Sequence, residues 1–181
     1  MKTIIKKLVI LYILCMTVVL SLGLTASAVT LNIPTRAQPS GSNWCWVTSA
    51  KMIGDYLTPG NGRTEAQTVK YLKGSADLSL GGNYIDHINA IKYITFNNYT
   101  YNRATNGFTA SFIKSNINSN KPMTVGVSNP NHVYAAIGYN DYFDTVYLIL
   151  NNPSGGIRQS VYLPHLIQGC SLGTYNDHFY R

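Results

Sequence analysis

The chain has 181 residues, of which 45% are hydrophobic and 12% are charged, and its formal net charge is +7. Its basic residues form no run after residue 28, which argues against a nucleic-acid partner because nucleic-acid-binding surfaces gather Lys and Arg on one face. The four His residues are scattered and no His-Glu-x-x-His or Cys-x-x-Cys spacing occurs, which excludes a zinc site. The seven acids are also scattered, which excludes a calcium loop and a paired-carboxylate glycosidase site. We therefore expect neither a metal nor a cofactor.

Residues 1–28 have the three parts of a secretory signal peptide. Lysines open the segment, an apolar stretch runs from Leu8 to Leu22, and Ala26-Ser27-Ala28 forms a small-residue cleavage site. Cys15 lies inside the apolar stretch, so we expect it to be removed with the leader. No later apolar run is long enough to span a bilayer. The sequence therefore predicts a secreted, extracellular product of one domain, residues 29–181, and its Asn-, Tyr-, Ile- and Lys-rich composition suggests a low-GC bacterium.

The first stretch that carries chemistry is a turn-forming run that passes directly into an apolar-periodic segment. Ser42 and Asn43 are good N-cap residues, and the apolar side chains from Val47 to Leu57 recur at helical spacing. Cys45 is thus expected in the first turn, where unpaired N–H groups and the helix dipole favour the thiolate. Gln38 can supply a side-chain N–H beside the backbone N–H of Cys45, and two such donors make an oxyanion hole.

Further elements follow in chain order. Residues 29–37 are expected to be extended, because Pro34 bars a helix. A capping box predicts a short helix over residues 64–73 that ends at Gly74, and isoleucines at three-residue intervals predict a core-facing helix over residues 85–94. The polar residues 97–107 predict a surface loop or an exposed hairpin. A fourth helix is expected from Thr109 to Ile117.

After Pro122 the apolar period changes from helical spacing to the alternation of strands. Four strands are predicted, over residues 123–127, 132–139, 145–151 and 158–163. Helices come first and an antiparallel sheet second. This order predicts an α+β domain of two lobes with a cleft where the lobes meet.

One of the four histidines is placed where a catalytic base could act. His132 begins a strand directly after a turn and can point off the sheet edge toward the helical lobe. The remaining three have other settings: His87 lies among apolar neighbours on a helix, His165 follows a proline at a strand end, and His178 sits in the tail. His132 is therefore the candidate base.

The next strand ends in Asn151 and Asn152, either of which could accept the ring N–H of His132 that faces away from the cysteine. Such a contact would fix the tautomer that leaves the other nitrogen free to take the thiol proton. The two asparagines lie on opposite faces of the strand, and periodicity does not choose between them. Ordinary turn chemistry before Pro153 explains at least one of them.

A structural role for Cys45 is the main alternative. Cys45 and Cys170 are the two cysteines that follow the leader, and short secreted chains commonly pair their cysteines in disulfides. On that reading the protein is a non-enzymatic secreted binding protein with a Cys45–Cys170 disulfide.

The chain resembles the papain-like cysteine peptidases, and among them the compact bacterial secreted forms such as the staphopains and the bacteriocin-processing peptidase domains. The resemblance rests on Gln38 before Asn43-Trp44-Cys45 and its helix, on the strand from His132 to Tyr139, and on Leu148 to Pro153. By this likeness Cys45 corresponds to the nucleophile, His132 to the general base and acid, Asn152 to the residue that orients the histidine, and Gln38 to the oxyanion donor.

The resemblance implies a papain-like fold and hydrolysis of peptide bonds in a peptide or protein substrate. Cell-wall amidases and peptidoglycan endopeptidases share the same Cys–His chemistry and remain an alternative. Only 16 residues separate the expected cleavage site from Cys45, which leaves no room for a folded blocking segment. A separate protein inhibitor is then one way in which the producing cell could be protected, beside export of an unfolded chain or a narrow substrate range.

Overall fold

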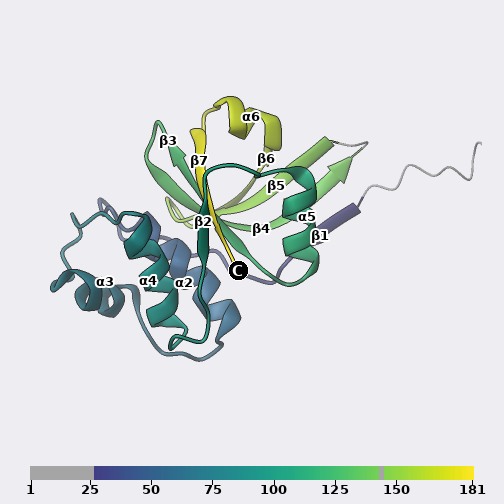
Figure 1. Ribbon diagram of the computed structural model, residues 1–181. Coiled ribbons are helices and arrows are strands. Elements are labelled where there is room, and N and C mark those ends of the chain that lie inside the picture. The colour runs from purple at the N-terminus through teal and green to yellow at the C-terminus, as the bar shows by residue number, and fades with distance from the viewer. Residues whose placement is uncertain (1–26, 143–144) are drawn as a thin grey trace, which may run out of the picture.

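The computed structural model describes residues 27–142 and 145–181, so most of the predicted leader, including Cys15, lies outside the described residues. The chain forms a helical lobe and a sheet lobe (Figure 1). Three helices that pack together make the helical lobe: α2 (Cys45–Leu57), α3 (Glu65–Lys73) and α4 (Tyr84–Ile94). The other elements are β1 (Ser27–Thr30), β2 (Asn102–Ala104), α5 (Ala110–Asn118), β3 (Met123–Ser128), β4 (His132–Tyr142), β5 (Thr145–Asn152), β6 (Ile157–Tyr162), α6 (Leu163–Gln168) and β7 (Thr174–Tyr180).

All strand pairs are antiparallel, and the order across the sheet is β2-β7-β3-β4-β5-β6, with β1 paired to the far half of β4. This arrangement confirms the predicted α+β class and all four predicted strands. Among the described residues three further strands, β1, β2 and β7, were not predicted. The C-terminal strand β7 lies inside the sheet between β2 and β3, so His178 is in a central strand rather than in a tail. Residues 97–107 are likewise no hairpin, because β2 pairs with β7.

Both ends of α3 follow the local sequence signals. Thr64 and Gln67 form the predicted capping box of α3, and Gly74 ends this helix with a φ of 82°, a left-handed conformation that glycine adopts without strain. The prediction for α4 was partly wrong, because Ile85 is 51% exposed whereas Ile94 is fully buried. A three-residue step falls roughly 60° short of a full helical turn, so isoleucines at this spacing drift around the helix and cannot all face the core.

Two helices belong to the sheet lobe. α5 packs on β4 and β1, so it does not join the three earlier helices as its place in the chain suggested. α6 was not predicted; it begins at Leu163, covers β5, β6 and β7, and contains His165, which is therefore on a helix and not at a strand end.

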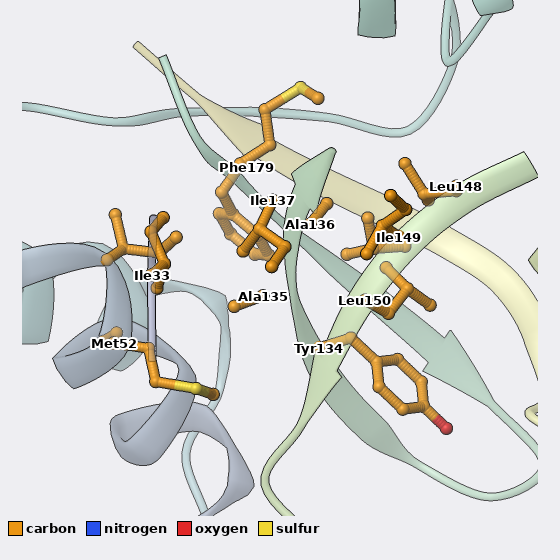
Figure 2. Close-up of a cluster of buried hydrophobic side chains, with 14 of the residues drawn as sticks. Ile33, Met52, Tyr134, Ala135, Ala136, Ile137, Leu148, Ile149, Leu150 and Phe179 are labelled. Atoms are coloured by element: carbon orange, nitrogen blue, oxygen red, sulfur yellow. The ribbon is translucent and has the colours of Figure 1, made fainter. Parts of the chain in front are cut away.

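The hydrophobic core includes buried side chains of the helical lobe, of the sheet strands, and of α5 and α6. Figure 2 shows Ile33 and Met52 on the helical side facing side chains of β4, β5 and β7. α2 also approaches α4 closely, because a Cβ on Gly54 would come within 2.3 Å of the Ile94 side chain. This close packing joins the C-terminal part of α2 to the C-terminal end of α4. No helix in the described ranges is long and apolar enough to cross a membrane.

Candidate active site

Cys45 is the first residue of α2 and lines a cleft between the lobes. The N-cap is Trp44, so the prediction of Ser42 or Asn43 as the cap was wrong. Asn43 instead donates its side-chain N–H to the carbonyl of Ser79, 2.9 Å away, and so fastens a neighbouring loop to the helix start. Within the described residues no side chain caps α2. The N–H groups of Cys45 and Trp46 in its first turn therefore face the Cys45 sulfur without a competing side-chain cap.

Burial raises the pKa of the Cys45 thiol, contrary to the lowered pKa expected from the helix dipole. Backbone hydrogen bonds at Val133, Trp46 and Cys45 itself act in the opposite direction, but the loss of hydration outweighs them. The contact with Val133 also places the sulfur beside the start of β4. The Ser49 hydroxyl strengthens this junction, because it donates to the Val133 carbonyl at 2.8 Å.

The side chain of His132 is oriented by a hydrogen bond between its Nε2 and Asn152 Oδ1, 2.8 Å apart. The backbone N–H of Ser154 donates to the same oxygen at 2.8 Å, which identifies it as the amide carbonyl oxygen. A carbonyl oxygen can only accept, so Nε2 carries the ring proton and Nδ1 keeps its lone pair. Burial lowers the pKa of His132, and the bond to Asn152 partly offsets that effect.

Asn151 has a different environment from Asn152. It is fully buried, and its side-chain N–H groups donate to the carbonyls of Ile33 at 2.9 Å and Pro34 at 3.2 Å. Arg158 donates to the Asn151 carbonyl oxygen and to the same Ile33 carbonyl. Asn151 thus holds the segment that leads to Gln38, whereas Asn152 contacts the histidine.

Gln38 reaches the cleft on an extended segment tied to both lobes. Its backbone N–H donates to the Pro153 carbonyl at 2.8 Å, and its side-chain Nε2 donates to the Ser42 carbonyl at 2.6 Å. Gln38 Oε1 is buried without a hydrogen-bond partner among the described residues. With one Nε2 hydrogen used by Ser42, the second is free to serve a ligand.

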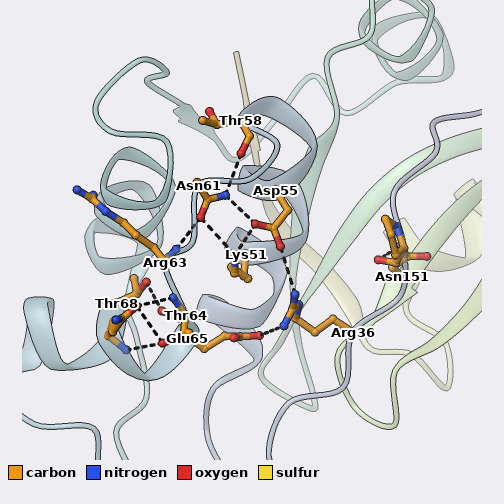
Figure 3. A network of polar contacts seen from close by, with 12 residues as sticks. Arg36, Lys51, Asp55, Thr58, Asn61, Arg63, Thr64, Glu65, Thr68 and Asn151 are labelled. Atoms are coloured by element: carbon orange, nitrogen blue, oxygen red, sulfur yellow. Dashed lines mark hydrogen bonds and ion pairs between the residues drawn. The ribbon is translucent and has the colours of Figure 1, made fainter.

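Arg36 anchors the same segment to the helical lobe. Figure 3 shows its guanidinium between Asp55 of α2 and Glu65 of α3, at 3.2 and 3.3 Å. Asp55 also pairs with Lys51 and accepts from Asn61, so the anchor is part of a wider polar network. The network holds Gln38 in place relative to the helix that carries Cys45.

The other three histidines are not oriented by Asn152, although His87 also lines the cleft. His87 is 1% exposed and hydrogen-bonds through both ring nitrogens, to the Trp46 carbonyl and the Thr124 hydroxyl, and burial lowers its pKa to about 4. His178 is equally buried and contacts the Tyr175 hydroxyl, and its pKa is also lowered to about 4 by burial. His165 is exposed on α6.

The cleft has a volume of about 880 Å³ and brings all four predicted site residues together. They are Gln38, Cys45, His132 and Asn152. Ser154 also lines it and was not predicted, because it acts through its backbone N–H and its side chain gives no signal.

Cys45 and Cys170 are both free thiols, so the alternative Cys45–Cys170 disulfide is not formed. In the described part of the chain no group of three or more His, Cys, Asp or Glu side chains could hold a metal ion.

Solved structures share this fold at low sequence identity. The digestive procathepsin L 3 of Tenebrio molitor larval midgut superimposes with a TM-score of 0.57 at 15% identity, over 87% of this chain and 70% of that chain. A structure from work on antibody cross reactivity between the mite allergens Blo t 1 and Der p 1 gives a TM-score of 0.54 at 14% identity, over 81% of this chain and 66% of that one. A search of curated proteins gives no match. The Peptidase_C39 like family model matches residues 30–165, and the chain therefore belongs to this family and is a papain-like cysteine peptidase.

Proposed function

We propose that the protein is a secreted peptidase that hydrolyses peptide bonds with Cys45, His132 and Asn152, and that Gln38 assists as an oxyanion donor. The observation that carries this proposal is the Asn152–His132 hydrogen bond in the cleft that Cys45 lines. It leaves His132 Nδ1 as the only ring nitrogen able to accept a proton. Secretion rests on the signal-peptide pattern of residues 1–28.

The reaction begins with a neutral thiol and a neutral imidazole, because burial raises the pKa of Cys45 and lowers that of His132. His132 Nδ1 takes the thiol proton as the sulfur attacks the amide carbonyl. The developing oxyanion receives hydrogen bonds from the backbone N–H of Cys45 and from Gln38 Nε2. His132 then gives its proton to the leaving amine, and a water molecule, activated by His132, releases the acyl group and restores the thiol.

Digestion of two substrate classes tests the proposal. We expect residues 29–181 under reducing conditions to cleave denatured casein, with new peptide ends detected by mass spectrometry and with loss of activity after alkylation by iodoacetamide. Purified bacterial cell wall serves as the second substrate. Release of cell-wall peptides without cleavage of casein would replace this proposal by the cell-wall amidase or endopeptidase alternative.

The two asparagines allow a matched test of the orienting role. We expect Asn152→Ala to lower kcat by roughly 10- to 100-fold, because the imidazole loses the partner that fixes its tautomer. Since the bond to Asn152 raises the pKa of His132, its loss lowers that pKa further, and the limb of the pH profile set by the imidazole moves to lower pH. The measurement is kcat/KM as a function of pH.

Asn151→Ala is the control for this pair. It leaves the Pro34 carbonyl without its donor and the Ile33 carbonyl with Arg158 alone, so it should lower the free energy of unfolding by about 1–3 kcal/mol and leave the pH profile in place. A shifted profile in Asn151→Ala together with an unchanged profile in Asn152→Ala would contradict the assignment.

A further inference from the structure

One ion pair lies among the described residues that line the cleft. Arg103 of β2 donates from Nε to Asp177 Oδ2 of β7 at 2.7 Å, and both residues line the cleft. The Asp177 side chain is 7% exposed and that of Arg103 is 33% exposed. Among the described residues that line the cleft, no other carboxylate and no other Lys or Arg is present. This pair therefore dominates the local electrostatics of its part of the cleft.

The sheet register relates the ion pair to the thiol. Val133, which contacts the Cys45 sulfur through its backbone, is paired with Gly126 of β3, and Gly126 is paired with Asp177. Two strand spacings of about 4.8 Å put Asp177 roughly 10 Å from Val133. An extended peptide advances about 3.3 Å per residue, so a side chain within roughly three residues of the scissile bond reaches the pair.

Both partners keep hydrogen-bonding groups that the protein does not use. Asp177 Oδ1 lies over Gly126, where a Cβ would come within 2.1 Å of it, and no donor among the described residues bonds to it. The guanidinium of Arg103 uses only Nε for Asp177, and its carbon lies 4.5 Å from the centroid of the Tyr84 ring. Asp177 Oδ1 is thus free to accept a hydrogen bond from a ligand, and the Arg103 Nη groups are free to donate one. The ion pair itself carries no net charge.

We propose that Asp177 and Arg103 form a specificity subsite for a primary amide, so that an Asn or Gln side chain of the substrate is preferred there. The amide N–H donates to Asp177 Oδ1, and the amide oxygen accepts from Arg103 Nη. A charged side chain is attracted by one partner of the pair and repelled by the other, so neither Lys, Arg nor an acid gains net electrostatic attraction there. An apolar side chain leaves both groups without the hydrogen bonds they make with water.

This inference rests on the proposed peptidase function, so its test measures binding as well as cleavage. Peptides that vary within three residues on either side of the scissile bond are given to the active enzyme, and cleavage is followed by mass spectrometry. The same peptides are titrated against Cys45→Ala by calorimetry. We expect one position to favour Asn or Gln over Leu, Lys and Glu by roughly tenfold in both measurements, the value expected for hydrogen bonds to charged groups.

Charge variants give the sharper result. Arg103→Met leaves an unpaired carboxylate and should turn the preference at that position toward Lys and Arg, whereas Asp177→Asn leaves an unpaired guanidinium and should turn it toward Asp and Glu. Arg181→Met is the control, since Arg181 stacks on Tyr99 and does not line the cleft. Equal alkylation rates of Cys45 in all variants verify that the site is intact.

The outcomes separate the two proposals. Amide-selective binding without cleavage would support the subsite and contradict the peptidase function. Cleavage with the same preferences in wild type and Arg103→Met, or with no preference for Asn or Gln at any position, would overturn the subsite.

Discussion

Replacing Cys45 by Ala should reduce peptide hydrolysis to less than roughly one part in 10³ of the wild-type rate, because Cys45 is the only thiol among the described residues that line the cleft. The fold should persist. Cys45 is only partly buried, and removal of one sulfur at the helix start costs little core packing, so we expect the free energy of unfolding to change by less than about 1 kcal/mol. Steady-state hydrolysis and urea denaturation measure the two quantities.

Cys170→Ala is the matched control, because Cys170 is also a free, partly buried thiol but does not line the cleft. Native residues 29–181 should contain two thiols that react after unfolding without prior reduction, and each single variant should contain one. Retention of activity in Cys45→Ala, or its loss in Cys170→Ala at unchanged stability, would contradict the assignment of Cys45 as the nucleophile.

The elements that sequence predicted well are those whose signals are local. The capping box at Thr64 lies within four residues of the chain, and the helix at Cys45 follows from its own apolar stripe. β7 could not be found in this way. Its buried residues include Asp177 and His178, whose polar character removes the alternation of an amphipathic strand, and their partners Arg103 and Tyr175 are identified only by the folded structure.

The site shows the same division between local and long-range information. Strand parity placed Asn151 and Asn152 on opposite faces, but it could not say which of them orients His132. Asn151 is used by the carbonyls of residues 33–34, and the position of that segment is known only from the folded structure. The pKa of Cys45 was expected to fall because the helix dipole is a local property. Burial reverses the direction, and burial is set by packing of α2 against β4, which the sequence around Cys45 does not encode.

Replacing His132 by Gln should lower kcat/KM by roughly 10²- to 10⁴-fold, because the thiol of raised pKa then has no base to take its proton and the leaving amine has no acid. Residual activity should rise steadily with pH as free thiolate forms, without the plateau that an imidazole base gives. His165→Gln is the control, since His165 is exposed on α6; His87 and His178 are buried, so their variants would lose stability instead. Hydrolysis measured against pH decides the matter: a His132→Gln profile parallel to that of wild type would show that another group is the base.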